Sequence, residues 1–355
     1  MCTRHPIHCF IPPYIMEHLT QSPHADVRAL AISNLASSSA FRAFRTSARA
    51  MPTLLASKSP SGGKNRLVYD AKGTNTLPGT LVRSEGGKTN RDPSVDQAFD
   101  GAGDVYDFYD TLFQRNSLDN NGMNLISTVH LADVDFKGDF VPLNNAFWNG
   151  QQMAYGDGDG VVFKSFTRSL EVIGHELTHG VQSFTSNLTY QGQSGALNEH
   201  FADVFGILIK QWKEGTAVAD ADWVIGKELL VPAPTRRGIR DMEHPGTAYK
   251  DDPDLGDDPQ PATMKGLYTG AKDSGGVHIN SGIPNRAFVL TAQALGGNAW
   301  EVAGRIWYET MLQLYTGSQF ADCARISVQI AGSADYGAAA KKAVTAAWKK
   351  VGVTV

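Results

Sequence analysis

The residues best suited to chemistry form the pentapeptide His175-Glu176-Leu177-Thr178-His179. On a helix, side chains four residues apart lie on one face, so both imidazoles can reach one metal ion. Glu176 points about 100° away around the helix axis, where its carboxylate can hold a metal-bound water. The alternative is two histidines on a solvated face. Apolar and glycine residues flank the motif and favour a buried helix, in which these side chains would be costly without a ligand.

A third metal ligand is expected, because catalytic zinc uses three protein ligands and leaves one position open. Glu199 follows His179 by 20 residues on the next predicted helix, and Asp203 lies four residues further along the same stripe. The Asp203 carboxylate can hydrogen-bond a ligand imidazole and fix its tautomer. An exposed helix carboxylate is the alternative for Glu199, and the pair of carboxylates favours the ligand. The expected cofactor is therefore a single Zn²⁺ ion.

The elements that position these residues follow from the patterning. Strand candidates bounded by turns lie at 65–73, 79–87, 124–132 and 144–160, with one helix expected at 95–113. From Thr167 onward apolar residues recur at helical spacing, at 169–184, 196–212, 283–295, 298–315 and 337–351. The sequence predicts an α+β fold with a β-rich N-terminal lobe at 51–187 and a mainly helical lobe at 188–355. The helix of the pentapeptide lies between them.

The composition excludes several classes of protein. With 355 residues, 42% hydrophobic, the chain can bury a large core. A net charge of −4 gives no reason to expect a nucleic-acid partner. No apolar run approaches the roughly 20 residues of a membrane helix. Only Cys323 follows the first ten residues, so no disulfide is possible within 10–355. We expect a monomer with no membrane partner.

The N-terminal residues 1–50 lack the apolar stretch and cleavage site of a signal peptide. We therefore expect either a cytoplasmic precursor or export by a route without a cleavable Sec signal. A transit peptide is an alternative, since this segment holds five arginines against two acidic residues.

Four blocks identify a family. "NNAFWNGQQMAYGDG", "HELTH", "GALNEHFADVFG" and "DSGGVHINSGIPN" follow one another in the order found in the thermolysin family of zinc metallopeptidases, which the chain resembles from about Val68 to its C-terminus. The resemblance implies a two-lobed zincin fold. It also implies a neutral endopeptidase that hydrolyses peptides and proteins on the N-terminal side of bulky hydrophobic residues.

The resemblance assigns catalytic roles. Glu176 matches the catalytic glutamate, His278 the second catalytic histidine, Asp273 the carboxylate that orients it, and Tyr190 the tyrosine beside the transition-state oxygen. Zinc lowers the pKa of bound water toward about 7, and a nearby carboxylate can then take the proton. Protonated His278 and Tyr190 can donate to the oxyanion. A core histidine and a packed tyrosine are the alternatives for these two residues taken alone.

A second function stays open, namely a catalytically silent zinc-binding or peptide-binding module of the same fold. Such a module has no use for a carboxylate beside the metal-bound water, so Glu176 favours catalysis.

The resemblance also implies a substrate site. Asn145 and Ala146 match the edge strand that pairs with substrate backbone, and Arg240 matches the arginine that contacts a substrate carbonyl. Five apolar residues fall where the family lines its S1′ pocket: Phe163, Phe166, Val172, Ile225 and Ile239. An extended peptide on an edge strand is read first through its backbone and then through side chains in pockets.

The chain departs from the family at a double calcium site. The matching positions are Glu171, Lys210, Asp222 and Lys227, two of them cationic. An ammonium group repels Ca²⁺ from the same place. We expect this double site to be absent, with the lysines paired to Glu171 and Asp222. Exposed lysines are the alternative, and calcium elsewhere stays open.

The first residues resemble the short pro-segment of the protealysin-like branch of the family. Pro12, Pro13, Tyr14 and Ile15 match its Pro-Pro-aromatic-aliphatic motif, and a short amphipathic helix is expected after Pro23. We expect residues 1–50 to dock on the catalytic lobes and to block the cleft as an intramolecular inhibitor. Removal by a cut is expected at about 49–55. For Cys9, a thiolate latch on the zinc and a plain packed cysteine both stay open.

Overall fold

The computed structural model of the chain describes residues 8–35 and 62–355. Its strands include β1 His8–Cys9, β2 Arg66–Asp70, β3 Thr80–Ser84, β4 Leu125–Val129, β7 Ala146–Trp148 and β8 Met153–Tyr155. Within the described ranges these six form one sheet in the order β1-β7-β8-β4-β2-β3. The β2–β4 and β4–β8 pairs are parallel and the other pairs are antiparallel. Two short ribbons complete the strands: β5 Ala132–Val134 with β6 Phe140–Pro142, and β9 Val224–Ile225 with β10 Arg240–Asp241.

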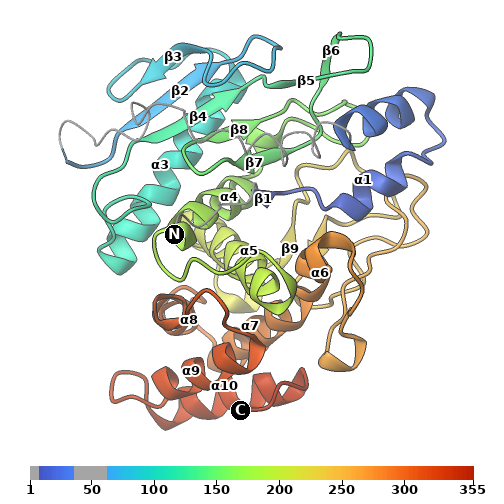
Figure 1. Ribbon diagram of the computed structural model, residues 1–355. Helices are drawn as coiled ribbons and strands as arrows, with labels where there is room; N and C mark the ends of the chain where they lie inside the picture. Colours follow the sequence, from blue (N-terminus) through green and yellow to red (C-terminus); the bar gives the residue numbers. More distant parts are fainter. Residues whose placement is uncertain (1–7, 36–61) are drawn as a thin grey trace.

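The remaining regular elements of the described residues are mainly helices, and Figure 1 shows those of the second half of the chain gathered on the far side of α4 and α5 from the sheet. The helices are α1 Pro13–Leu19, α3 Pro93–Phe113, α4 Leu170–Ser183, α5 Gly192–Glu214, α6 Lys272–Asn280, α7 Gly282–Leu295, α8 Val302–Gln313, α9 Phe320–Ala331 and α10 Gly337–Lys350. Residues 25–35 are helical as well. Among the described residues, no helix is long and apolar enough to cross a membrane.

The long helix α3 packs on β2 and β4 and covers one face of the sheet. Asp92 caps its start, since the side chain accepts hydrogen bonds from the backbone N–H groups of Ser94 and Val95. Pro93 occupies the first turn, where the missing N–H of proline costs no hydrogen bond. The buried residues of α3 include Val95, Ala98, Phe99, Ala102, Val105, Phe108 and Tyr109. Their helical spacing is the pattern that predicts this helix from sequence.

Two glycines let α4 and α5 cross with their backbones in contact. A Cβ atom added to Gly206 would lie 2.5 Å from the carbonyl oxygen of Glu171, and one added to Gly174 would lie 3.1 Å from the Cα atom of Gly206. Any larger side chain at Gly206 would therefore push the helices apart. On its other side α4 packs against β7, so this helix lies between the sheet and the helical lobe.

The expected α+β architecture of two lobes with the motif helix at their junction is confirmed. The helix expected after Pro23 is present at 25–35, and it buries Val27 and Ala31. The boundaries at 50/51 and 187/188 stay predictions, and the expected cut at 49–55 lies outside the described residues.

Several elements were not expected, among them β1, α1, α6, α9 and the β5–β6 and β9–β10 ribbons. The two-residue strand β1 is too short to show a period in the sequence. The helix α1 begins at Pro13, because proline fits the first turn of a helix.

His130 ties the end of β4 to two distant loops. Its Nε2 atom lies 2.9 Å from an Asp92 oxygen, and its Nδ1 atom lies 2.8 Å from an Asp157 oxygen. The hydrogen bond to Asp157 raises the pKa of His130 to about 9, although partial burial opposes the shift.

We predict that His130→Gln destabilises the protein in a pH-dependent way. The folded-state pKa is raised, so the stabilisation is fully present below the unfolded-state pKa of about 6.5. It is lost as the pH rises through the folded-state pKa of about 9. We expect a loss of about 1 kcal/mol at pH 6, discounted for the partial exposure of the ion pairs, and a smaller loss at pH 10. Urea unfolding at both pH values measures it, with the exposed His24→Gln as control. Equal losses at both pH values would contradict it.

Candidate active site

Three predicted ligands converge on one point between α4 and α5. The Nε2 atoms of His175 and His179 lie 3.1 Å apart, and Glu199 oxygens lie 3.4 Å and 3.5 Å from them. All three side chains are buried. Ligands at about 2.0–2.1 Å from a tetrahedral zinc ion lie about 3.4 Å from each other. The donor set and its spacing therefore fit one Zn²⁺ ion.

The imidazole rings are held so that Nε2 faces this centre. The Nδ1 atom of His175 lies 2.9 Å from Oδ1 of Asp203, as expected from the sequence. The Nδ1 atom of His179 lies 2.7 Å from Oδ1 of Asn198. Each Nδ1–H donates to an oxygen, and the Nε2 lone pair is left for a metal. Asn198 was missed because the sequence search considered only carboxylates, although an amide oxygen accepts the same hydrogen bond.

The electrostatics of the cluster favour a positive charge at its centre. Burial lowers the pKa of His179 to about 3. Burial would also lower the pKa of His175, but the carboxylates of Asp203 and Glu199 raise it to about 9. Burial opposes ionisation of Glu199 too, yet the neighbouring histidines hold its pKa well below the usual range. A bound cation would supply the same charge without a proton.

Glu176 lies beside the cluster, with one carboxylate oxygen hydrogen-bonded and the other without a partner among the described residues. Its Oε2 atom accepts a hydrogen bond of 2.9 Å from the backbone N–H of Trp148 on β7. Its Oε1 atom is buried and has no hydrogen-bond partner among the described residues. Burial raises the pKa of the Glu176 carboxyl to about 8. The carboxylate is thus fixed by the sheet and keeps one free oxygen for a water.

His278, Asp273 and Tyr190 come together beside Glu199 of the cluster. The Nδ1 atom of His278 lies 2.6 Å from Oδ1 of Asp273, and its Nε2 atom lies 3.2 Å from the hydroxyl of Tyr190. The Tyr190 hydroxyl also donates a hydrogen bond of 2.5 Å to Glu199. Burial opposes protonation of His278, but the charges of Glu199 and Asp273 raise its pKa.

The backbone turns sharply just before His278 and so positions its side chain. Residues 273–276 at the start of α6 have positive φ angles of 53°, 51°, 81° and 81°. The first two, Asp273 and Ser274, are not glycines, so the bend carries some backbone strain. The Oδ2 atom of Asp273 accepts the backbone N–H of His278 at 2.8 Å, which holds the bend closed.

Arg240 on β10 is buried and bound in bidentate fashion to Asp203. Its Nε and Nη2 atoms lie 2.9 Å and 2.8 Å from the two carboxylate oxygens. Its remaining Nη1 atom lies 3.4 Å from the backbone oxygen of Phe10 in the N-terminal segment. The predicted substrate arginine therefore contacts a peptide carbonyl, and that carbonyl belongs to the chain itself.

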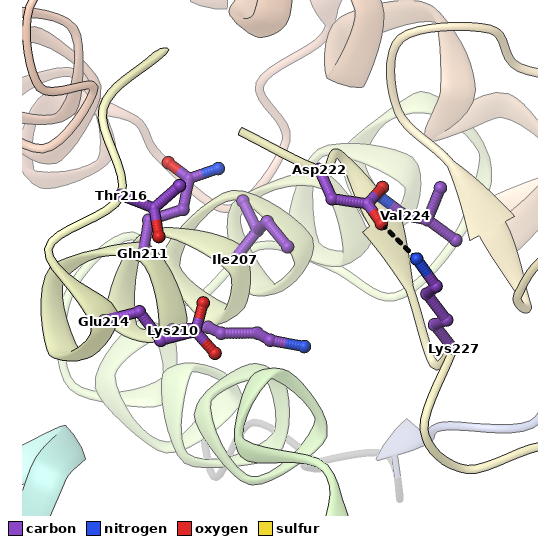
Figure 2. A pocket seen from close by; sticks show the side chains of 8 residues that line it. All are labelled: Ile207, Lys210, Gln211, Glu214, Thr216, Asp222, Val224 and Lys227. Carbon is purple, nitrogen blue, oxygen red and sulfur yellow. Dashed lines mark hydrogen bonds and ion pairs between the residues drawn. The ribbon is translucent and has the colours of Figure 1, made fainter. Parts of the chain in front are cut away.

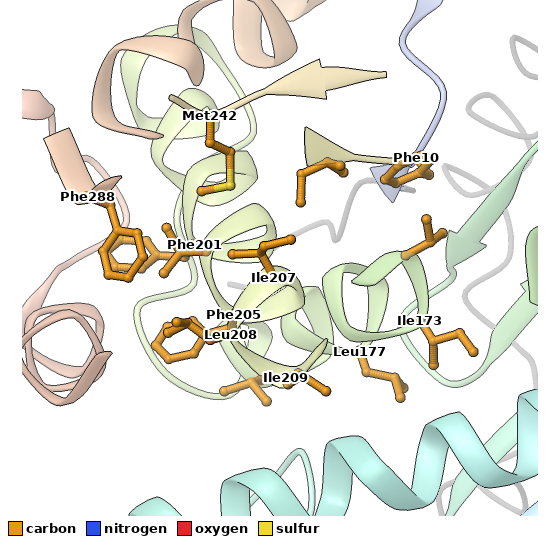
Figure 3. Close-up of a cluster of buried hydrophobic side chains, with 14 of the residues drawn as sticks. Phe10, Ile173, Leu177, Phe201, Phe205, Ile207, Leu208, Ile209, Met242 and Phe288 are labelled. Atoms are coloured by element: carbon orange, nitrogen blue, oxygen red, sulfur yellow. The ribbon is translucent and has the colours of Figure 1, made fainter. Parts of the chain in front are cut away.

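The residues expected to line S1′ are all buried in a shared hydrophobic cluster. They are Phe163, Phe166, Val172, Ile225 and Ile239. Phe10 belongs to the same cluster, and a Cβ added to Gly226 would touch both the Ile239 and the Phe10 side chains. Figure 3 shows Phe10 on the N-terminal segment, among the buried side chains drawn from this cluster.

The predicted edge strand is paired with the N-terminal segment. β1 pairs with β7 in antiparallel fashion, with Cys9 opposite Phe147. Beyond β1 the N–H of Phe10 donates to the carbonyl of Ala146 at 3.1 Å. The N–H of Ile11 donates to the side-chain oxygen of Asn145 at 3.0 Å.

The Pro-Pro motif and α1 extend the contact between the N-terminal segment and the rest of the protein. Pro12 is the N-cap of α1, and Pro13, Tyr14 and Ile15 form its first turn. Ile15, Met16 and Leu19 of α1 are buried.

The positions of the double calcium site are occupied by ion pairs. The Lys210 ammonium lies 3.4 Å from a Glu171 oxygen and 3.0 Å from a Glu228 oxygen. The Lys227 ammonium lies 2.7 Å from Asp222, as Figure 2 shows. Both expected pairings are present, and Glu228 is an additional partner that was not expected.

The His-His-Glu cluster and the carboxylate beside it, at the junction of a sheet lobe and a helical lobe, define a metallopeptidase of the zinc-dependent kind. Comparisons with known proteins specify the family. A family model described as the thermolysin metallopeptidase catalytic domain matches residues 45–183. A second, described as its alpha-helical domain, matches residues 186–353. The chain belongs to the thermolysin family of metallopeptidases, and its assignment as a metalloprotease is confirmed.

Individual relatives and a solved structure support this family assignment. An extracellular metalloprotease of Pectobacterium carotovorum subsp. carotovorum is 48% identical over 300 residues, which cover 84% of each chain. A thermolysin of Alicyclobacillus acidocaldarius is 35% identical over 303 residues, 82% of this chain and 51% of the relative. The solved structure of the protealysin precursor from Serratia proteamaculans superposes with a TM-score of 0.86 at 43% identity, covering 98% of this chain and 100% of that one. The predicted protealysin-like branch is confirmed.

We predict that Asn198→Ala lowers zinc affinity by about 10- to 100-fold, because the His179 ring loses the acceptor that fixes its tautomer. Competition against a chelating dye at constant pH measures the affinity. Asn298→Ala, which removes the same kind of side chain from the loop before α8, serves as the control and leaves the affinity unchanged. An Asn198→Ala protein that binds zinc as tightly as the parent would refute the role of this amide.

Proposed function

We propose that the chain is the precursor of a zinc-dependent endopeptidase that cuts on the N-terminal side of bulky hydrophobic residues. The observation that carries the proposal is the free, buried oxygen of Glu176 beside the cluster of His175, His179 and Glu199. A zinc ion bound there supplies a Lewis acid that brings the pKa of a coordinated water near 7.

Side chains of the protein would perform the proton transfer and stabilise the negative charge. Glu176, held by the Trp148 N–H, accepts a proton from the attacking water and returns it to the leaving amine. Burial raises the pKa of the Glu176 carboxyl, and a zinc cation bound beside it would oppose that shift and favour the carboxylate that acts as the base. His278 and Tyr190 donate to the oxygen that becomes negative, and Asp273 orients the imidazole.

The proposed specificity rests on three kinds of contact. Asn145 and Ala146 offer acceptors to the backbone of an extended peptide, as they do to residues 10 and 11. Arg240 donates to the carbonyl of the residue after the cut. The apolar cluster around Ile239 then receives a large side chain, and the fully buried Phe10 ring illustrates the size that it accepts.

The N-terminal segment, residues 1–50, is proposed to act as the inhibitor of the same cleft. Of its described part, residues 8–11 lie along the edge of β7, and residues further on make polar contacts with the catalytic lobes. Ser22 donates to Asp254 at 2.6 Å, Asn34 donates to Asp133 at 2.9 Å, and Glu17 lies 2.8 Å from Lys272. Removal by a cut at 49–55 would free the cleft. Since the Pectobacterium relative is named an extracellular metalloprotease, export is the location we propose.

A silent binding module of the same fold is the alternative. It gains nothing from burying the Glu176 carboxylate with an unpaired oxygen, which costs free energy unless a ligand or water uses it. Catalysis is therefore the better account.

We predict that Glu176→Gln abolishes peptide hydrolysis, a loss of at least about 10²–10⁴-fold, because the amide cannot take a proton. Each protein is matured with a trace of trypsin, which is then inhibited, and a peptide with Phe after its scissile bond is assayed. Zinc content, measured by metal analysis, stays at one ion. The exposed Glu214→Gln is the matched control and keeps full activity. Retained hydrolysis in the Glu176→Gln protein would falsify the mechanism.

We also propose that the double calcium site is absent, because the Lys210 and Lys227 ammonium groups already neutralise its carboxylates. Millimolar Ca²⁺ is then predicted to leave the Tm of the zinc-loaded protein within about 2 °C, since a ligand that does not bind contributes no stabilisation. The double variant Lys210→Glu, Lys227→Glu is predicted to gain a Ca²⁺-dependent rise in Tm. A rise of many degrees in the unaltered protein would contradict the proposal.

A further inference from the structure

The N-terminal segment follows the edge of β7 residue by residue. His8 lies opposite Trp148 and Cys9 opposite Phe147. The N–H of Phe10 then reaches the carbonyl of Ala146. The segment is therefore bound as an added antiparallel strand, the way an extended peptide adds to an exposed sheet edge. Contacts of this kind fix a register, so each residue of the segment has a defined place relative to the site.

Phe10 places its side chain in the apolar cluster. Its side chain is fully buried, and its ring centroid lies 5.3 Å from that of the His175 imidazole. The Arg240 guanidinium lies 4.7 Å from the centroid of the same ring and also faces the Phe10 carbonyl. A residue in this place corresponds to the one that follows the cut in the proposed function.

Cys9 presents its carbonyl to the groups proposed to stabilise the oxyanion. The backbone oxygen of Cys9 lies 3.2 Å from Nε2 of His278. The Tyr190 hydroxyl lies 3.2 Å from the same nitrogen. The bond between Cys9 and Phe10 thus has its carbonyl at the donors and its N–H on Ala146.

We infer that the Cys9–Phe10 peptide bond is a substrate of the protein's own site, so that the segment is bound in the direction and register of a substrate. The inference rests on the proposed function. A water oxygen bonds to the carbonyl carbon of Cys9, the bond from that carbon to the Phe10 nitrogen breaks, and Glu176 carries the water proton to that nitrogen. The products are residues 1–9 with a new carboxylate and a chain that begins with the amino group of Phe10.

This cut differs from the one that would release the inhibitor. The part of the segment after Phe10 stays anchored by α1, which buries Ile15, Met16 and Leu19, and by the bond of Ser22 to Asp254. Loss of β1 exposes only the half of the cleft along Phe147 and Trp148. The half on the Phe10 side stays filled. The first product is therefore a shortened precursor that is still inhibited.

The experiment uses the full chain, purified in chelator and then supplied with Zn²⁺. Intact mass and N-terminal sequencing follow the products over time. We expect a new terminus at Phe10 at a rate independent of protein concentration, because the bond lies in the protein's own cleft. Phe10→Leu retains the cut since the pocket takes aliphatic side chains, whereas Phe10→Asp and Glu176→Gln remove it. Phe136→Asp, at a ring that is 76% exposed on the β5–β6 ribbon, is the matched control and leaves the cut unchanged.

A second measurement needs neither metal nor hydrolysis. In the chelated protein, hydrogen exchange of the Phe10 and Ile11 amides reports their bonds to Ala146 and Asn145. Asn145→Ala is expected to speed exchange at Ile11 by at least about tenfold, the value of one hydrogen bond near 1.4 kcal/mol. Unchanged exchange would overturn the register.

The two hypotheses fail in different ways. If trypsin-matured protein hydrolyses an unrelated peptide but no terminus at Phe10 ever forms, the inference is overturned while the proposed function stands. If the protein hydrolyses neither, both are overturned.

Discussion

One buried carboxylate, that of Asp203, connects the parts on which this site depends. It accepts hydrogen bonds from His175 on α4, from Arg240 on β10 and from Asn285 on α7. Burial opposes ionisation, but the Arg240 guanidinium holds the pKa of Asp203 below its usual range. Removing one partner of such a buried pair typically costs about 3–5 kcal/mol, because the other charge is left unpaired. The orientation of His175, a proposed zinc ligand, and the position of Arg240, the proposed substrate-binding arginine, are thus set by a single group.

That coupling explains how an N-terminal segment can fit the site so closely. The groups that a peptide backbone needs are held in place by the catalytic lobes, through Asp203 for Arg240 and through the sheet for Ala146. The segment uses these groups through its own backbone N–H donors, which bind the acceptors of Asn145 and Ala146. The inhibition that we propose therefore requires no contacts beyond those that a substrate would make. Anchoring at Asp254 and Asp133, far from the metal ligands along the chain, adds affinity that a short free peptide lacks.

The sequence predicts most of the metal site because helix geometry is local. The spacing of His175 and His179, and that of Glu199 and Asp203, places each pair on one helix face whatever the rest of the fold. The helices with clear periodicity, such as α3 and α5, were expected for the same reason. The meeting of α4 with α5 at one centre was expected from the donor chemistry, because three ligands need one ion.

What could not be predicted depends on contacts between distant residues. Asn198 carries no signature as a partner of His179, since an amide side chain is common on helices. The pairing of Cys9 with Phe147 joins the N-terminal segment to a strand of the β-rich lobe, and no local pattern encodes that register. The ion pairs of His130 likewise depend on how two loops fold back beside β4. The proposed assignment of Ile225 and Ile239 to the S1′ pocket came only from the family resemblance.

The backbone contact at Gly174 and Gly206 separates the spacing of the three ligands from the apolar packing around them, which proteins often combine. Because the two helices touch through main-chain atoms, the distance between their ligands is set by helix geometry, with little dependence on the size of the surrounding apolar side chains. The ordering of the three ligands is completed during folding, so little conformational entropy remains to be lost when an ion arrives. Over evolutionary time the apolar packing around α4 and α5 can drift while the catalytic geometry is inherited unchanged, provided that the two glycines stay.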